Sequence, residues 1–469
     1  MKNNFSISLT VLLLIILIVT INYFENNITK IQVSEIVRKD SPDKFKEYFS
    51  SIKKGDESNE NLYPIGYKEK ELLKMKKNLY KKSLLRSSIV QKDNNNPNFG
   101  ASAAATTTFT ERGPTNVPGR TRSIVVDAAD NTGSTWYAAA VGGGVWKTSD
   151  SGTTWTSLSQ DLENIAVSSL AQSSANPSVL YAGTGESWVG NIDAIDGSGV
   201  FKSTNGGLNW SNVSPITSGI VDDKFFQVSR IIANPSNADI VIATTMDPDG
   251  WSYIFKSTDG GSTWAEAKKS AKRLQQVIAA PTSFDTIYAA VRGGNALKSV
   301  DAGTTWNDLP IYSSSVSGQF NRAEIAVSHN TANILYSALE GSTPSKSHVF
   351  VSFDGGSTWT EAANQDGTLE DYLQIFGWYA NTIVVHPYND SIFYTGSVDI
   401  YKSKLTNLLY KNTIHLTDGY NDIDSLNTNV HVDHHFLGII KDKSTDHNLT
   451  LTATGNSDYI FNSSSLSLN

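Results

Sequence analysis

The sequence contains no cysteine among its 469 residues. Disulfide bonds, thiolate metal sites and cysteine nucleophiles are therefore excluded. Methionine is also rare, with three residues, whereas glycine (34), tyrosine (19) and tryptophan (10) are plentiful. Such a chain is expected to be globular and rich in turns, and to take its stability from the burial of large rings rather than from cross-links.

Positive charge is scarce outside the first hundred residues. Residues 1–100 carry 17 Lys and Arg against 11 Asp and Glu, whereas the remaining residues carry 21 against 35. An acidic body lacks the basic stripe that a nucleic-acid surface requires, so we expect no nucleic-acid partner. No glycine-rich phosphate loop precedes a helical pattern, because "VGGGVW" belongs to a pair of strands. We therefore expect no nucleotide and no other cofactor.

Long apolar runs are confined to the N-terminus. A short positive start, "MKNN", precedes a stretch that is almost wholly apolar from Val11 to Ile21. This pattern predicts an export signal over residues 1–25. Residues 7–24 are also just long enough to span a membrane, so a cleaved signal peptide and an uncleaved anchor both remain open. We expect an exported protein, secreted or associated with the cell envelope, that meets a membrane only through such an anchor.

The rest of the chain changes character near residue 109. Residues 26–108 form a Lys-rich, partly helical spacer that ends in the low-complexity linker "QKDNNNPNFGASAAATTT". From Phe109 onward, short β-branched runs alternate with Gly, Asn, Asp and Pro, and helical periodicity is absent. The sequence thus predicts an all-β domain over residues 109–469.

This domain is built from a repeated unit. Each copy has a β run ending in a turn, then a short strand such as "LYAGTG" or "IYAAVR", then a strand, turn and strand such as "IFKSTDGGSTW". Units of 40–55 residues with about four strands each are typical of β-propeller blades. A sixth unit starts at Asn381 and a seventh near "HVDHHFLGII". We therefore predict about seven four-stranded blades, the last of them degenerate or truncated, with an open edge as one alternative.

The most regular part of the repeat is the pattern S/T-x-D-x-G-x-T-W, known as the Asp-box. Its acidic or amide position is filled by Asp150, Asn205, Asp259, Asp301 and Asp354, and its last position by Trp155, Trp210, Trp264, Trp306 and Trp359. A catalytic role predicts one special copy, and a calcium site needs several carboxylates in each loop. Five similar copies at blade intervals instead favour structural turns, closed by the Asp or Asn side chain and a glycine with positive φ.

These boxes resemble those of the Asp-box propeller superfamily, which includes sialidases, xyloglucan-cleaving glycoside hydrolases and the sortilin ectodomain. The segments "ERGPTNVPGRTRSIVVD" and "GGGVWKTSDSGTTW" are similar to the sortilin-like and xyloglucanase-like propellers of large exported bacterial proteins. The resemblance implies a propeller and, in the enzymatic members, glycoside hydrolysis. However, the Arg-Ile-Pro stretch of sialidases is missing, Val141 stands where xyloglucan hydrolases have a catalytic Asp, and there is no second propeller to supply their other acid.

Several polar residues remain as candidates for ligand binding. One group precedes the apolar cores of the predicted inner strands, where it would line the channel mouth: Arg122, Arg230, Gln276, Glu324, Asn381 and His435. A second group combines aromatic and polar side chains on loops, as in sugar sites: Glu186, Trp188, Trp378 and Tyr379. In "NVHVDHHFL", His431, Asp433 and His435 share one face of a strand and form either a metal site or a hydrogen-bonded network. We expect no metal.

Two functions remain in competition. The missing catalytic residues favour a non-catalytic module that binds an extracellular protein or a glycan. The alternative is a glycoside hydrolase, which would use Glu186, Glu324 or Asp433 and needs two carboxyl groups about 5–10 Å apart. Pairing of these acids with arginine would count against the enzyme.

Overall fold

The computed structural model describes part of the chain. The described residues are 110–111, 120–159, 161–187, 195–217, 220–311, 321–341, 347–364, 371–373, 376–407, 410–417, 434–441, 449–454 and 460–463. All of them belong to the second of the two units into which the chain divides, residues 95–469. No helix within these ranges is long and apolar enough to cross a membrane, and the predicted signal segment lies outside them.

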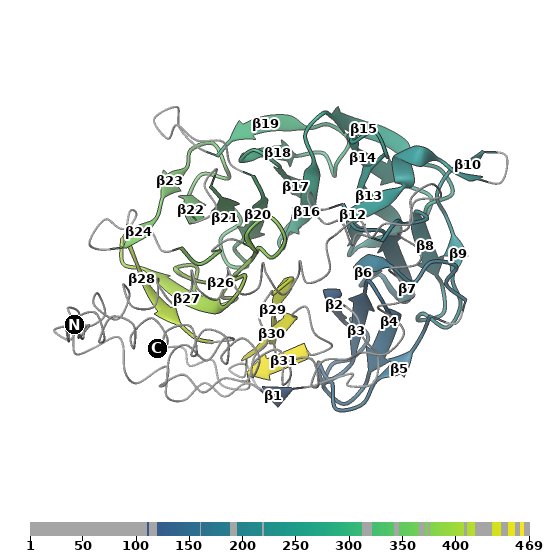
Figure 1. Cartoon of the computed structure of the whole chain (residues 1–469), viewed down its shortest axis with the longest axis horizontal. Coiled ribbons are helices and arrows are strands. Elements are labelled where there is room, and N and C mark those ends of the chain that lie inside the picture. Colours follow the sequence, from purple (N-terminus) through teal and green to yellow (C-terminus); the bar gives the residue numbers. More distant parts are fainter. Residues whose placement is uncertain are drawn as a thin grey trace, which may run out of the picture. The chain divides into compact units, whose positions relative to one another are not determined.

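The described strands form seven antiparallel blades arranged in a ring (Figure 1). The inner strands are β2 (Thr121–Val126), β6 (Val167–Ser173), β12 (Gln227–Asn234), β16 (Leu274–Ala280), β20 (Ala323–Val327), β25 (Thr382–Val385) and β29 (Phe436–Lys441). The second strands are β3 (Trp136–Ala140), β7 (Asn176–Thr184), β13 (Asn237–Met246), β17 (Ser283–Val291), β21 (Leu335–Glu340), β26 (Ile392–Gly396) and β30 (Leu449–Thr454).

The outer half of each blade is more irregular. The third strands are β4 (Gly144–Thr148), β8 (Val200–Ser203), β14 (Ser252–Ser257), β18 (Asn295–Ser299), β22 (Ser347–Ser352), β27 (Ile400–Leu405) and β31 (Ile460–Ser463). The fourth strands are β5 (Thr156–Ser157), β9 (Ser211–Asn212), β15 (Ala265–Ser270), β19 (Asn307–Pro310), β23 (Thr360–Glu361), β28 (Tyr410–His415) and β1 (Thr110–Glu111). Blade 6 gains β24 (Ala363–Asn364), parallel to β28. A hairpin of β10 (Ile216–Thr217) and β11 (Ile220–Val221), followed by the 3-10 helix η1 (Asp223–Phe225), joins blades 2 and 3.

The predicted propeller of about seven blades is confirmed, and its last blade is not left open. Each inner strand contacts the inner strand of the next blade, and β29 contacts both β25 and β2, which closes the circle. The outer strand of blade 7 comes from the other end of the domain, because Thr110 pairs with Asn462 and Glu111 with Phe461. This closure could not be predicted from the sequence, because a strand of two residues has no recognisable pattern.

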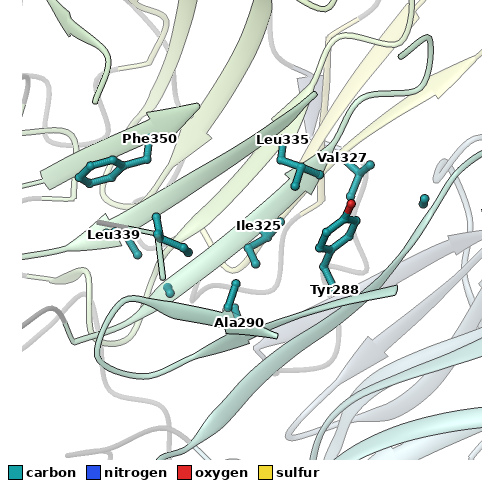
Figure 2. Close-up of a cluster of buried hydrophobic side chains, with 11 residues drawn as sticks. Tyr288, Ala290, Ile325, Val327, Leu335, Leu339 and Phe350 are labelled. Atoms are coloured by element: carbon teal, nitrogen blue, oxygen red, sulfur yellow. The ribbon is translucent and has the colours of Figure 1, made fainter. Parts of the chain in front are cut away.

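Packing between blades holds the ring together. The strands β21 and β22 are buried along their whole length because both of their faces lie against neighbouring blades. Figure 2 shows one such interface, in which Tyr288 and Ala290 of blade 4 pack against Ile325, Leu335 and other side chains of blade 5. These continuous apolar strands explain why the repeat reads as short hydrophobic runs without alternation.

The two ends of a blade differ in chemistry. The second strand runs back beside the first, so the start of the inner strand and the end of the second strand lie together, as in the pairing of Thr121 with Ala140. We call this the mouth end. The Asp-boxes follow the third strands and therefore lie at the opposite end, which we call the box end.

Each Asp-box is a closed hydrogen-bonded turn. Asp259 Oδ1 accepts hydrogen bonds from the Ser257 hydroxyl and the Thr263 N–H, both at 2.8 Å, and Oδ2 accepts from the Thr263 hydroxyl at 2.6 Å. The turns of Asp150, Asp301 and Asp354 repeat these bonds. These donors, with the Thr263 hydroxyl first, lower the pKa of Asp259 to about 2. The carboxylate therefore has its partners within its own turn.

The boxes also dock onto neighbouring structure. The residue after the acidic or amide position donates its N–H to a carbonyl in or just before the first residues of the second strand of the same blade; these pairs are Ser151–Ser134, Gly206–Ser178, Gly260–Asp239, Ala302–Asp285 and Gly355–Asn333. In two boxes the Trp ring N–H reaches the preceding blade: Trp210 donates to the Leu158 carbonyl and Trp264 to that of Val213. A box therefore closes its own blade and, in these two cases, ties it to the blade before.

The divergent second box offers a test of this hydrogen-bond scheme. In place of the Asp–Thr pair, the Asn205 amide donates to Asn209 Oδ1 at 2.9 Å, so the direction of that bond is reversed. Asn205→Asp alone replaces the donating amide group with a carboxylate oxygen, which would then face Asn209 Oδ1 without a hydrogen between them. We expect this substitution to lower the free energy of unfolding by about 1 kcal/mol. The double variant Asn205→Asp/Asn209→Thr should recover most of this loss, as measured by urea unfolding. Additive effects of the two substitutions would contradict the scheme.

Candidate functional site

The inner strands of blades 1 to 4 begin with a β-bulge at the mouth end. The register shifts skip Arg122, Ser168, Ser229 and Gln275 in turn. The Ser168 and Ser229 hydroxyls each donate to a backbone carbonyl of the next inner strand, and Gln275 Oε1 accepts from a backbone N–H of the blade that follows. Bulges re-aim side chains in this way, and here they link adjacent blades around the channel.

In blade 1 the bulged residue is Arg122, which forms a buried ion pair. Its Nη2 lies 2.9 Å from Glu186 Oε1, and Arg120 Nη2 lies 2.5 Å from Glu186 Oε2. Glu186 follows β7 of blade 2, and its side chain is fully buried, as is that of Arg122. Burial alone would raise the pKa of Glu186, but the charges of Arg122 and Arg120 outweigh it and lower the pKa below its usual value.

Arg122 also connects blade 1 with the last two blades. Its Nη1 lies 2.8 Å from His435 Nδ1, and its guanidinium stands 4.5 Å from the ring centre of Tyr379. The ring of His435 meets that of Tyr379 edge-on, with 4.6 Å between centroids. The first and last parts of the propeller thus meet in one polar and aromatic cluster.

A second buried ion pair lies in blade 5. Arg322 Nη2 lies 2.8 Å from Glu324 Oε1, while Arg230 of blade 3 approaches Glu324 Oε2 at 3.9 Å. Arg322 Nη1 also donates to the backbone carbonyl of Tyr379, which Arg122 Nη1 approaches at 3.4 Å. Burial lowers the pKa of Arg322 to about 10, so the guanidinium remains charged at neutral pH. We call Arg120, Arg122, Glu186, Arg230, Arg322, Glu324, Tyr379 and His435 the mouth cluster.

A third acid at this end has a different environment. Glu340 ends β21, is buried, and accepts a hydrogen bond at 3.2 Å from the backbone N–H of Arg322. Burial raises the pKa of its carboxyl group, although that N–H and the charges of Arg322 and Arg292 act in the opposite direction. Neither Glu340 nor Arg322 is among the residues that the sequence patterns indicate as candidates. Arg322 lies only two residues before Glu324, one residue outside the inner strand that drew attention to Glu324.

The remaining candidates from the sequence have separate places. The Gln276 side chain forms hydrogen bonds with the backbone of Ile325 in the next blade. The Asn381 amide donates a hydrogen bond to the Ala338 carbonyl at 3.1 Å. Trp378 is half-buried, and its ring centroid lies 5.1 Å from that of Tyr379. Trp188, His431 and Asp433 lie outside the described residues. Within the described part, no group of three His, Asp or Glu side chains is arranged to hold a metal ion.

The mouth cluster is poorly suited to acid–base catalysis. Glu186 and Glu324, the two described acids that a hydrolase was expected to use, are both paired with arginines. A general acid must keep its proton near neutral pH, whereas Arg122 and Arg120 keep Glu186 ionised. What the cluster does provide is a largely buried, ion-paired floor at the mouth end.

Comparison with known proteins agrees with this fold. A family model described as Sortilin, neurotensin receptor 3 (Sortilin-Vps10) matches residues 252–466. A xyloglucanase from Paenibacillus sp is 26% identical over 274 residues, which is 56% of this chain and 22% of the relative. The chain therefore spans about a fifth of the length of that relative.

Two solved structures share the fold at low identity. An ancestral GH74 enzyme aligns with a TM-score of 0.54 and 18% identity, covering 78% of this chain and 47% of the enzyme. YCF48, in a structure bound to D1 peptide, aligns with a TM-score of 0.51 and 12% identity, covering 78% of this chain and 99% of YCF48. With the five boxes and the seven closed blades, these matches lead to one conclusion: the chain is an Asp-box-repeat β-propeller that resembles sortilin-like and xyloglucanase-like propellers.

Proposed function

We propose that this protein is an exported binding module whose mouth end engages an extracellular protein or glycan. The observation that carries the proposal is the pairing of Glu186 and Glu324 with arginines, which leaves neither acid suited to catalysis. A floor of buried ion pairs suits a recognition surface, because side chains already held by their partners lose little conformational freedom when a ligand binds.

The likeness to other propellers supports a binding role in two ways. YCF48, which this chain covers almost completely, was solved bound to a peptide, and the xyloglucanases are named for a polysaccharide substrate. Because a propeller can host unrelated functions, these likenesses support a ligand class only in combination with the site.

Trp378 is the residue we expect to contribute most to binding at this end. It is half-buried beside Tyr379, so part of its ring is available to a partner above a fixed base. Trp378→Ala should weaken binding of a ligand found on glycan and peptide arrays by about tenfold, which is typical of a central aromatic contact. Tyr388→Ala is the matched control, because Tyr388 is an exposed aromatic at the box end. Equal effects of the two substitutions would contradict a binding site at the mouth end.

A glycoside hydrolase acting on polysaccharide is the second candidate. The xyloglucanase relative supports it, and Glu340 supplies one buried carboxyl group with a raised pKa, as a general acid requires. Release of reducing sugar from xyloglucan should be followed in the same samples. If the protein releases reducing sugar from xyloglucan and Glu340→Gln abolishes this release, the protein is a hydrolase and the proposal of a non-catalytic module is rejected.

A further inference from the structure

A group of positive charges lies at the mouth end of blades 3 and 4, apart from the mouth cluster. Lys269 is the second-last residue of β15, the outer strand of blade 3. Lys272 and Arg273 lie in the connection to β16, and Arg292 follows β17. The Arg292 N–H donates to the Arg273 carbonyl at 2.8 Å, which places these two residues side by side. We call these four residues the basic band. It runs from the rim of the propeller towards its channel.

Among the described residues, no member of the basic band forms a direct ion pair with an acid, although the charge of Arg292 acts on the buried Glu340 carboxyl group. Arg273 donates to the Ser187 carbonyl, and Arg292 Nη2 donates to Asn321 Oδ1 at 3.3 Å, so both contact neutral oxygens. Nearby, Lys224 forms an ion pair with Glu266 at 2.8 Å. Burial and the charge of Arg292 together lower the pKa of Arg273. Four cations are thus gathered without a direct ion pair in a chain whose net charge is −8.

A fixed aromatic ring stands at the outer end of the basic band. Trp251 is 41% exposed, and the Lys269 ammonium lies 4.2 Å from its ring centre. The Trp251 loop is held by Asp247, whose Oδ1 accepts from the Trp251 N–H at 2.8 Å and whose Oδ2 accepts from the Tyr253 hydroxyl at 2.7 Å. Another acid, Asp249, lies at the tip of this loop, two residues before Trp251. The loop therefore presents a rigid indole beside a cation.

We propose that the basic band and Trp251 form a second binding site, for an acidic polysaccharide. The cations would pair with carboxylate or sulfate groups, and Trp251 would stack on a pyranose ring. From β15 to the inner strand the site crosses one blade, whose four strands span about 15 Å at 4.8 Å spacing. That length suits an extended chain of a few sugars with regularly spaced charges. Trp251 favours a polysaccharide over an acidic peptide because it offers a flat apolar face rather than a pocket for a side chain.

Binding by the full chain should be measured with polygalacturonate, which carries carboxylates, and with dextran sulfate, which carries sulfate esters. We expect binding to at least one of them and none to neutral dextran, with affinity that falls steeply between 50 and 200 mM salt. Which polymer binds identifies the anionic group. Binding of neutral dextran as tight as that of both acidic polymers, or binding of neither acidic polymer, would overturn the proposal.

Two variants separate this site from general charge attraction. Lys269→Gln/Lys272→Gln should weaken binding about tenfold, because two cations are removed from the basic band. Lys147→Gln/Lys256→Gln makes the same charge change at the box end and should have little effect. Equal weakening by the two double variants would show that net charge, not the basic band, attracts the polymer.

The role of the ring can be tested with a polyanion that lacks sugars. Trp251→Ala should weaken polysaccharide binding several-fold and leave the binding of inorganic polyphosphate unchanged, because only the sugar stacks on the indole. Equal loss for polyphosphate, or no loss for the polysaccharide, would remove Trp251 from the site. Tighter binding of single-stranded DNA than of either polysaccharide would overturn the assignment to a glycan.

Discussion

Gly303→Ala should destabilise the propeller by about 2–5 kcal/mol, measured as a lower urea midpoint. Gly303 has φ +80°, which an L side chain adopts only at a cost of about 1–2 kcal/mol. In addition, a Cβ at this position would lie 2.3 Å from Ile242 Cδ1, which is fully buried in the preceding blade. Overpacking of this kind adds about 1–3 kcal/mol. The effect is large because the box turn sits directly on its neighbour.

Two further variants separate the backbone cost of a positive φ from the cost of the steric clash with Ile242. Gly250 has a similar φ of +89°, but a Cβ there would have nothing within 4 Å, so Gly250→Ala should show the backbone cost alone. Adding Ile242→Val to Gly303→Ala removes the clashing methyl group and should recover part of the loss. If Gly303→Ala cost no more than Gly250→Ala, the proposed contact between box and preceding blade would be wrong.

Glu186→Gln should cost about 3–5 kcal/mol, the range typical of breaking a buried ion pair. The substitution preserves size but removes the negative charge between Arg122 and Arg120, and the Arg122 side chain is only 1% exposed. An unpaired charge in that position cannot be solvated, so the folded state would lose stability. Urea unfolding measures the loss directly.

The matched control is Glu266→Gln. Glu266 pairs with Lys224 at 2.8 Å, but both side chains are well exposed, so its removal should cost at most about 1 kcal/mol. Similar losses for the two substitutions would mean that Glu186 contributes little as a charge. The mouth cluster would then be a packing arrangement rather than an ion-paired floor.

The repeat was sufficient to predict the blades because each of blades 1 to 6 is built from one continuous stretch of the chain. The strands of these blades follow one another along the chain, and Asp259 and Trp264 belong to a turn motif that is visible in the sequence itself. By contrast, Arg122 and Glu186 are 64 residues apart in different blades. Both residues could be predicted as candidates from the sequence, but their pairing could not, because it depends on the bulge at Arg122 and on how two blades meet.

The sequence does not show how blades meet, and this also explains why Gln276 and Asn381 were expected to face a ligand. A polar residue before an apolar strand looks alike whether it binds a ligand or a neighbouring backbone. In the structure, Gln276 bonds to Ile325 and Asn381 to Ala338 of a neighbouring blade. Buried polar groups require partners, and in a ring of blades the nearest partners are the backbone groups of the next blade.

The closure of blade 7 also sets an order of assembly. Blades 2 to 5 can form as soon as their own strands are available, whereas Thr110 must find Asn462 after the intervening chain has taken shape. Contacts between residues so far apart in the chain form slowly. The joining of β1 to β31 is therefore expected to be the last step of folding, and its two residue pairs the first to separate when the ring opens.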